Sequence, residues 1–318
     1  MQRSEALTKK IGVLYGGTSS ERSVSLETGA MIHKALVARG YDAILIDQGP
    51  DLPAALVAHG IDVAFIALHG KWGEDGCVQG LLEVMRIPYT GAKVFGSALA
   101  MDKHLSKIAF REAGLPVAPY AIVTRDLAAA FTAADLPFNL PAVVKPNAEG
   151  SSVGVTIVHD EAALRTALEE ALRFDERLLV EKFVAGQEVS ACVLNGEPLG
   201  VIGIKPARGF YDFTAKYQDD GTAYPYPAPL PPDQYARCLE IGRIANAVVR
   251  GEGATRADII VADDGEMAVL EINTLPGMTS HSLVPQVARA EGIPFEELCE
   301  RILLCASLGL SEPKEARR

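Results

Sequence analysis

The sequence predicts a mixed α/β fold in which a doubly wound parallel sheet is followed by antiparallel sheets. Residues 11–89 alternate short apolar segments with helical patterns, a rhythm typical of a parallel sheet with helices on both faces. From about Gly186 consecutive strands replace the helical crossovers, which is typical of antiparallel pairing. The chain has 318 residues, 48% of them hydrophobic, enough for two or three domains with a large core.

The amino-terminal part contains three short apolar segments separated by helical patterns. We expect strands over 11–15, 41–47 and 61–68, and helices over 22–39, 51–59 and 77–85. In such sheets, ligands bind beyond the carboxyl ends of the strands, where the glycine loop 16–22 and the loop that begins at His69 both lie. Thr18 and Glu21 fit a capping box, and their spacing alone favours that role over ligand binding.

The middle of the chain alternates expected helices over 102–113, 126–134 and 160–174 with strands over 119–124, 142–145, 155–158 and 178–183. Lys103 stands near a helix start, where a cation is unfavourable unless a phosphate binds there; an ordinary surface lysine is the commoner case. Residues 147–154 form a small loop with glycines, which lets backbone amides approach a ligand closely.

The same loop contains a pattern that resembles the nucleophile elbow of serine hydrolases. Residues 150–154 read GSSVG and match G-x-S-x-G, with Ser152 in the nucleophile position. That motif requires a strand before the serine and a helix after it. The β-branched residues that follow predict a strand instead, so we reject a serine hydrolase.

The carboxyl-terminal part centres on an expected hairpin of strands 255–262 and 267–273. Asp264-Gly265 is a strong turn signal, and a two-residue turn there places Asp258 opposite Glu271 and Arg256 opposite Asn273 on one face. Leu270 would then face the core. Strands over 186–194 and 198–205, a long irregular stretch over 207–232 and helices over 232–250, 284–290 and 295–308 complete this part.

The hairpin predicts a metal site. Two directly opposed carboxylates repel each other, and they lie close enough for a cation to bridge them. Asp258, Glu271 and Asn273 offer only oxygen ligands, which Mg²⁺ or Mn²⁺ prefers. We expect Mg²⁺ ions here that carry the phosphates of a nucleotide. A solvated strand face with scattered charge is the equally weighted alternative, because the register is inferred.

Composition narrows the class of protein further. The formal net charge of −11 argues against a nucleic-acid binder or a protein of anionic membranes. The five cysteines form no CxxC pair, which is typical of reduced thiols in the cytosol. Neither a signal peptide nor an apolar run of about 18 residues is present, so we expect a cytoplasmic protein.

Several long strings, in order along the chain, together resemble the D-alanine–D-alanine ligase family of the ATP-grasp superfamily. They are GGTSSERSVSL (16–26), ALHGKWGEDG (67–76), PYTGAKVFGSALAMDK (88–103), VVKPNAEGSSVG (143–154), FYDFTAKY (210–217) and LEINTLPGMTSHSLVP (270–285). The resemblance implies a three-domain ATP-grasp architecture: an amino-terminal domain over 1–100, a central one over 101–186 and a carboxyl-terminal one over 187–318 with the lid loop and the metal site. It also implies a homodimer.

The resemblance implies that ATP lies between the last two domains and meets residues from both. The implied nucleotide contacts are Lys103, Lys145, Ser152, Glu181, Lys182, Phe183, Val184, Glu188, Phe210 and Leu270. Lys103 and Lys145 would bind phosphates, Glu181 the adenine and Glu188 the ribose. Two Mg²⁺ (or Mn²⁺) ions would be held by Asp258, Glu271 and Asn273, which agrees with the hairpin register.

The implied reaction joins two D-alanines through an acylphosphate, for peptidoglycan precursor synthesis. Residues implied to act in it are Glu21, Ser151, Tyr217, Arg256 and Gly277, and those implied to bind the substrates are His69, Lys216, Ser282 and Leu283. In the family that this chain resembles, a tyrosine at the position of Tyr217 goes with an amine nucleophile, so the resemblance implies D-alanine and not D-lactate as the second substrate. The rival readings are another ATP-grasp carboxylate–amine ligase, a D-alanine–D-lactate ligase, and a non-catalytic ATP-binding regulator, which would be expected to lack an intact metal set.

Overall fold

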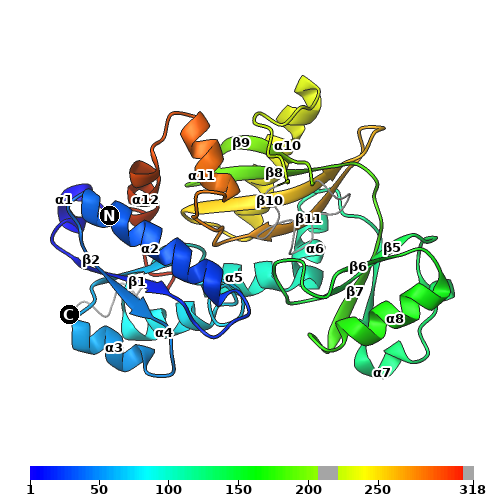
Figure 1. Cartoon of the computed structure of the whole chain (residues 1–318), viewed down its shortest axis with the longest axis horizontal. Helices are drawn as coiled ribbons and strands as arrows, with labels where there is room; N and C mark the ends of the chain where they lie inside the picture. The colour runs from blue at the N-terminus through cyan, green and yellow to red at the C-terminus, as the bar shows by residue number, and fades with distance from the viewer. Residues whose placement is uncertain (207–220, 311–318) are drawn as a thin grey trace.

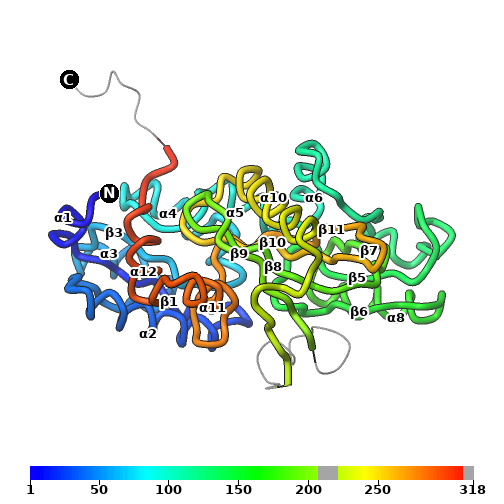
Figure 2. Tube along the Cα trace, turned by 90° about the horizontal axis from the view of Figure 1, so that it is seen from above, coloured from blue at the N-terminus to red at the C-terminus, as the bar shows by residue number. Residues whose placement is uncertain are grey.

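The computed structural model describes residues 1–206 and 221–310 and contains three sheets in a row. One sheet has three strands and the other two have four each. In Figure 1 the sheet with β1 and β2 lies at the left, the sheet with β8 to β11 in the middle, and the sheet with β5 to β7 at the right. The view from above has the same order (Figure 2). The expected mixed α/β architecture is confirmed.

The amino-terminal sheet is parallel, in the order β2-β1-β3, as the alternating pattern predicted. Its strands are β1 (Lys10–Tyr15), β2 (Asp42–Asp47) and β3 (Val63–Ile66). Helix α2 (Arg22–Ala38) packs its apolar side chains on one face. Helices α3 (Leu52–His59) and α4 (Cys77–Met85) cover the other. In Figure 1 the arrow of β1 points toward the rest of the molecule, so the carboxyl ends of these parallel strands face the other two sheets.

The sheet at the right of Figure 1 is antiparallel, in the order β4-β7-β5-β6. It consists of β4 (Tyr120–Thr124), β5 (Ala142–Pro146), β6 (Thr156–Val158) and β7 (Arg177–Lys182). Helix α8 (Glu161–Ala171) buries Leu164 and Leu168 against it. Strand β6 follows the glycine loop, so the helix that a nucleophile elbow requires is absent there, as predicted.

The central sheet is antiparallel in the order β11-β10-β8-β9, and helices cover both of its faces. Its strands are β8 (Gln187–Leu194), β9 (Glu197–Ile204), β10 (Ala254–Val261) and β11 (Met267–Asn273). Helix α10 (Pro232–Val248) packs on one face, together with apolar residues of α6 (Lys103–Glu112). Helix α11 (Leu283–Ala290) packs on the other.

One hydrophobic cluster joins the amino-terminal sheet to the central sheet. It includes Ile32 of α2, Ile202 of β9 and Leu298 of α12 (Phe295–Leu303), so the last helix packs on the first domain. Helix α6 belongs to the expected domain over 101–186, whose strands form the right-hand sheet of Figure 1. Its apolar residues nevertheless pack with the sheet of β8 to β11, which belongs to the expected domain over 187–318. The division at residues 100 and 186 therefore stays a proposal, although the chain changes sheets between Lys182 and Gln187.

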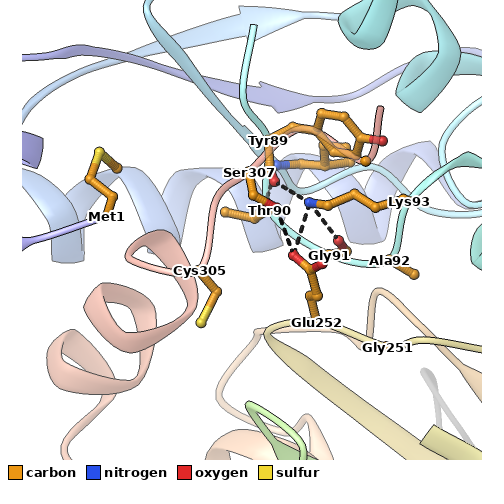
Figure 3. Close-up of polar contacts among 12 residues, drawn as sticks. Met1, Tyr89, Thr90, Gly91, Ala92, Lys93, Gly251, Glu252, Cys305 and Ser307 are labelled. Atoms are coloured by element: carbon orange, nitrogen blue, oxygen red, sulfur yellow. Dashed lines mark hydrogen bonds and ion pairs between the residues drawn. The ribbon is translucent and has the colours of Figure 1, made fainter. Parts of the chain in front are cut away.

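A partly buried lysine, Lys93, links the same two parts (Figure 3). Lys93 Nζ lies 3.0 Å from Glu252 Oε2 and donates to the carbonyl oxygens of Tyr89 at 3.0 Å and Gly91 at 3.4 Å. It also lies 4.3 Å from the centre of the Tyr89 ring. Ser307 donates to Glu252 from the carboxyl-terminal segment. This junction lies outside both cavities described below.

The largest error in the expected elements is the helix over 126–134. The structure has only a short helix α7 (Arg125–Ala128) and a 3-10 turn over Ala133–Asp135. Thr132 and Asp135 form a reciprocal capping box, which starts a new turn where the helix was expected to continue. The helix expected over 295–308 ends at Leu303. Helices α1 (Arg3–Ala6) and α5 (Val94–Met101) were not predicted.

Among the described residues, no helix is long and apolar enough to span a membrane.

We expect E300Q to lower the free energy of unfolding by about 2 kcal/mol at neutral pH, because charge-assisted hydrogen bonds are lost. The Glu300 carboxylate of α12 accepts from Arg39 directly after α2, from Arg3 at 2.8 Å and from the Tyr41 hydroxyl at 2.7 Å. Arg39 first, with Arg3 and Tyr41, lowers the pKa of Glu300 to about 2. The folded state thus keeps this carboxylate charged after the unfolded chain binds its proton, so the stabilisation is present above pH about 4.3 and disappears as the pH falls toward 2.

Denaturant unfolding at several pH values measures the difference. E297Q is the matched control, since Glu297 pairs with Arg301 within the same helix on a more exposed surface. Its effect should stay below about 0.5 kcal/mol. Equal effects of the two substitutions at neutral pH would contradict the stabilising role of the contacts that Glu300 makes with Arg3, Arg39 and Tyr41.

Candidate active site

The β10–β11 hairpin has the predicted pairing at its polar end. Arg256 pairs with Asn273 and Asp258 with Glu271. The turn is not the expected two-residue turn, because Ala262 pairs with Glu266 across a three-residue loop. A bulge beside Asp258 compensates for the extra residue, since Ile259 pairs with Val269 and leaves Leu270 without a direct partner. Leu270 therefore lines a cavity instead of facing the core, and Val269 is buried in its place.

A cavity of about 530 Å³ lies between the right-hand sheet and the central sheet, a volume typical of small-molecule sites. It brings together every expected nucleotide contact that the structure describes. These are Lys103, Lys145, Ser152, Glu181, Lys182, Phe183, Val184, Glu188 and Leu270. Asp258 and Glu271 line it as well. Phe210 lies outside the described residues.

A second cavity, of about 650 Å³, adjoins the first and reaches the amino-terminal sheet. It collects the remaining expected site residues that the structure describes. These are Glu21, His69, Ser151, Arg256, Asn273, Gly277, Ser282 and Leu283. Lys216 and Tyr217 lie outside the described residues. Lys103, Glu149 and Glu271 line both cavities, so these side chains stand where the cavities meet.

Lys103 connects the walls of both cavities at that boundary. Its ammonium lies 3.1 Å from Glu271 Oε2 and donates to the Glu149 carbonyl oxygen at 2.5 Å. The residue is 8% exposed, so it is not the ordinary surface lysine that its position in the sequence left open. A buried cation at a helix start attracts anions both by its charge and through the helix dipole.

The glycine loop reaches across to the amino-terminal part. The Ser151 hydroxyl donates to Glu21 Oε1, and the Glu149 carboxylate forms an ion pair with Lys71. Glu21 makes no capping bond to its helix, so the capping-box reading is wrong. A Cβ at Gly70, where φ is +69°, would lie only 2.6 Å from Glu21 Oε2. Glycine at that position leaves room for the carboxylate.

The expected metal ligands are held by cationic and hydroxyl groups. The Arg256 guanidinium lies 2.9 Å from both oxygens of Asp258, and Ser190 donates to Asp258 at 2.5 Å. Asn273 Oδ1 accepts from the Leu275 amide at 2.9 Å. Within residues 1–206 and 221–310, no group of three or more His, Cys, Asp or Glu side chains is arranged to hold a metal ion. The donors available are two carboxylates and one amide.

Family comparison decides the class of this site. Residues 109–304 match the family described as D-ala D-ala ligase C-terminus, and residues 48–92 match the D-ala D-ala ligase N-terminus. The chain belongs to the D-alanine–D-alanine ligase family.

Similar proteins cover nearly the whole chain. A D-alanine–D-alanine ligase of Geotalea uraniireducens is 51% identical over 98% of this chain and 100% of its own length. One of Anaeromyxobacter sp. (strain Fw109-5) is 53% identical over 94% and 97%. The crystal structure of the Bacillus anthracis ligase, at 36% identity, superimposes with a TM-score of 0.82 over 93% of this chain and 97% of that one. Its complex with ATP, at 33% identity, gives 0.80 over the same fractions. These are ATP-grasp proteins, so the expected architecture is confirmed.

His69 lies deep in the second cavity of this ligase-family chain. Its Nδ1 lies 3.2 Å from Glu74 Oε1, and its Nε2 lies 3.2 Å from the Thr28 hydroxyl. Burial lowers the pKa of His69, but the hydrogen bond and charge of Glu74, with the charge of Glu21, outweigh burial and raise it above the usual value. The imidazole can therefore present positive charge to a carboxylate.

Two charged residues of the site were missed by sequence reasoning. Glu149 borders both cavities, and its neighbours in the glycine loop were singled out while it was not. Lys107 lies one helical turn after Lys103 and is completely buried. The four-residue spacing of Lys103 and Lys107 was the available signal, since it places both lysines on one helix face.

We expect E74Q to lower the pKa of His69 relative to the wild type. The substitution removes the negative charge and the strong acceptor that oppose burial, so desolvation should then dominate. NMR titration of the His69 ring protons measures the change. E27Q is the matched control, because Glu27 lines the same cavity on an exposed helix face and is not among the causes of the shift. An unchanged pKa in E74Q would contradict this account.

Proposed function

We propose that this chain forms D-alanyl-D-alanine through an acylphosphate, with ATP in the first cavity and the two D-alanines in the second. Membership of the family makes the chain an ATP-dependent ligase that forms a carbon–nitrogen bond. One observation supports this assignment of ATP and the D-alanines to the two cavities. The first cavity is lined by lysines, the second contains a carboxylate and a histidine, and both are lined by Lys103 and Glu271, so they adjoin each other. Reacting groups from the two cavities can meet at that boundary.

In the first step, a carboxylate oxygen of one D-alanine attacks the γ-phosphorus of ATP, and the bond to the β-phosphate oxygen breaks to release ADP. Lys103 and Lys145 bind the phosphates and stabilise the charge that moves between them. Glu181, Glu188 and Leu270 hold the adenosine. The backbone of the glycine loop at Ser152 covers the phosphates. The position of Ser152 in the wall of the first cavity supports this role.

The first D-alanine is held at its two charged ends. Glu21 binds its ammonium group, and Ser151 holds the Glu21 carboxylate in place through the hydroxyl hydrogen bond. Tyr217, which lies outside the described residues, would complete this network. The raised pKa of His69 favours contact between the imidazole and the substrate carboxylate. Fixing both ends aligns the attacking oxygen with the phosphate.

In the second step, the amine of the other D-alanine attacks the acylphosphate carbon. The carbon–nitrogen bond forms, the carbon–oxygen bond to phosphate breaks, and the amine loses its proton. Arg256 and the Gly277 amide stabilise the negative oxygen of the tetrahedral intermediate. Ser282 and Leu283, with Lys216 from outside the described residues, hold the second carboxylate. Exclusion of water protects the acylphosphate from hydrolysis.

The residues present fit Mg²⁺ or Mn²⁺ by their chemistry. Asp258 and Glu271 are paired across adjacent strands, and each already attracts a cationic side chain, Arg256 and Lys103 respectively. Their oxygens and that of Asn273 are hard ligands, and phosphate oxygens or water would complete the coordination. When bound, two such ions neutralise charge on the transferring phosphoryl group.

A D-alanine–D-lactate ligase is the second candidate function, since a fold does not fix the nucleophile. Tyr217 in the sequence favours an amine nucleophile. We also propose that the protein acts in the cytoplasm as a homodimer, in line with the resemblance, and that it supplies the dipeptide for peptidoglycan precursors.

The purified chain should release phosphate from Mg-ATP when D-alanine is present and should form D-alanyl-D-alanine in equal amount. L-alanine should give neither product, because its side chain would occupy the position of the α-hydrogen. Coupled phosphate detection and mass spectrometry measure both products, and D-lactate offered with D-alanine tests the second candidate function. Absence of dipeptide with D-alanine, while ATP still binds, would overturn the proposed substrate.

E271Q should weaken the dependence of nucleotide binding on Mg²⁺, because one of the two carboxylates that attract the ions is lost. Titration calorimetry of ADP binding with and without Mg²⁺ gives the dependence. E266Q on the same hairpin, at the turn and outside both cavities, is the control and should bind like the wild type. If E271Q keeps the full effect of Mg²⁺, the hairpin is not the metal site.

A further inference from the structure

Lys107 is the most deeply buried charged side chain near the nucleotide cavity, yet it lines neither cavity. It is 0% exposed, and its ammonium lies 2.5 Å from Glu181 Oε1 and donates to the Val269 carbonyl oxygen at 3.1 Å. A buried ammonium without a partner would be very unfavourable, so these contacts fix its position. No step of the proposed reaction uses this residue.

The contacts of Lys107 determine how the Glu181 carboxylate is oriented. Lys107 occupies Oε1, while Lys145 lies 2.6 Å from Oε2. Because each oxygen has its own cation, the carboxylate plane is fixed and neither oxygen has to turn toward the other lysine. A carboxylate keeps further acceptor sites on both oxygens, so Glu181 can still accept from an amino group in the cavity.

Lys107 also joins two opposite walls of the nucleotide cavity. Glu181 belongs to β7 of the right-hand sheet, and Val269 belongs to β11 of the central sheet. The Val269 carbonyl lies directly beside Leu270, the bulge residue that lines the cavity. One ammonium group therefore holds both the polar and the apolar element that would contact a base.

The charge balance of the cluster gives Lys107 a second effect. Lys107, Lys145 and Glu181 together carry a formal charge of about +1 when all three are ionised. Without Lys107, the remaining pair would be neutral, and Glu181 would be free to bind Lys145 with both oxygens. Less of the positive charge of Lys145 would then act on the phosphates of an anionic nucleotide.

We propose that Lys107 is a positioning residue that sets both the affinity for the nucleotide and the preference for a 6-aminopurine base. It acts through Glu181, Lys145 and the Leu270 bulge, and it does not contact the nucleotide. The 6-amino group of adenine donates to the fixed Glu181 carboxylate. Guanine has an oxygen at the same position, and this oxygen and the carboxylate repel each other because both are hydrogen-bond acceptors. The proposal rests on the assignment of the first cavity to ATP.

K107M tests the inference, because methionine is an unbranched side chain only one atom shorter than lysine and carries no charge. We expect the Kd for ADP and the KM for ATP to rise about tenfold, a loss typical of one charge-assisted contact. The preference for ATP over GTP, compared as kcat/KM, should fall several-fold. The KM for D-alanine should change less than about twofold, since the second cavity is not touched.

The matched control is K93M, which removes a partly buried lysine that is also paired with a glutamate, away from both cavities. It should lower the melting temperature without changing the KM for ATP or the ATP/GTP preference. K107R should restore part of the preference because it keeps the charge. If K107M does not fold, K107Q, which removes the charge but keeps a donor for Glu181, serves in its place and should raise the Kd for ADP by less than about tenfold.

Wild-type ATP/GTP preference in folded K107M or K107Q would overturn the inference, and so would an equal rise in the KM values for ATP and D-alanine. Binding of ADP and GDP to the purified protein separates the two proposals. If the wild type bound ADP but formed no dipeptide, the proposed substrate would fail while the role of Lys107 could still be measured by this binding preference. If the wild type did not discriminate ADP from GDP, the Lys107 inference would fail by itself.

Discussion

Repulsion between two carboxylates on adjacent strands is the constraint around which this molecule is arranged. Asp258 and Glu271 are directly opposed on β10 and β11, a placement that destabilises a sheet unless positive charge is close. Arg256 on β10 supplies part of that charge, and Lys103 at the start of α6 supplies more. The two cavities meet at these same groups, so the charges that stabilise the folded hairpin also define where an anionic nucleotide and its cations would lie.

Much of the architecture was predictable because the local signals are strong. The period-2 strands, the parallel βαβ rhythm and the glycine loops gave nearly every long element, and the opposed pair Asp258–Glu271 followed from the turn. The predicted pairing is correct although the predicted turn is not. The turn has one residue more than expected, and the bulge at Leu270 compensates for the shift in register, so Asp258 still pairs with Glu271. A bulge depends on tertiary contacts, such as that between Lys107 and Val269, which no local pattern contains.

The site residues divide in the same way. Those within distinctive strings, such as Lys145 and Ser151, were found by resemblance, and the structure places all the described ones around the two cavities. Lys107 was missed because it resembles any lysine on a polar helix, and its burial arises only when two sheets close over it. The helix over 126–134 failed for a simpler reason, since Thr132 and Asp135 form a competing cap.

The pairing of α12 with α2 has a consequence for the order of events in the cell. A ribosome releases the chain from its amino terminus, so β1, α2 and β2 emerge well before α12. The cluster that contains Ile32 and Leu36 is completed only by Leu298 and Leu303, and Arg3 and Arg39 find their carboxylate at Glu300. The first domain therefore keeps an uncovered apolar face until α12 has been translated. Folding of this domain is therefore coupled to the synthesis of α12, and nascent chains that stall before α12 would expose this face.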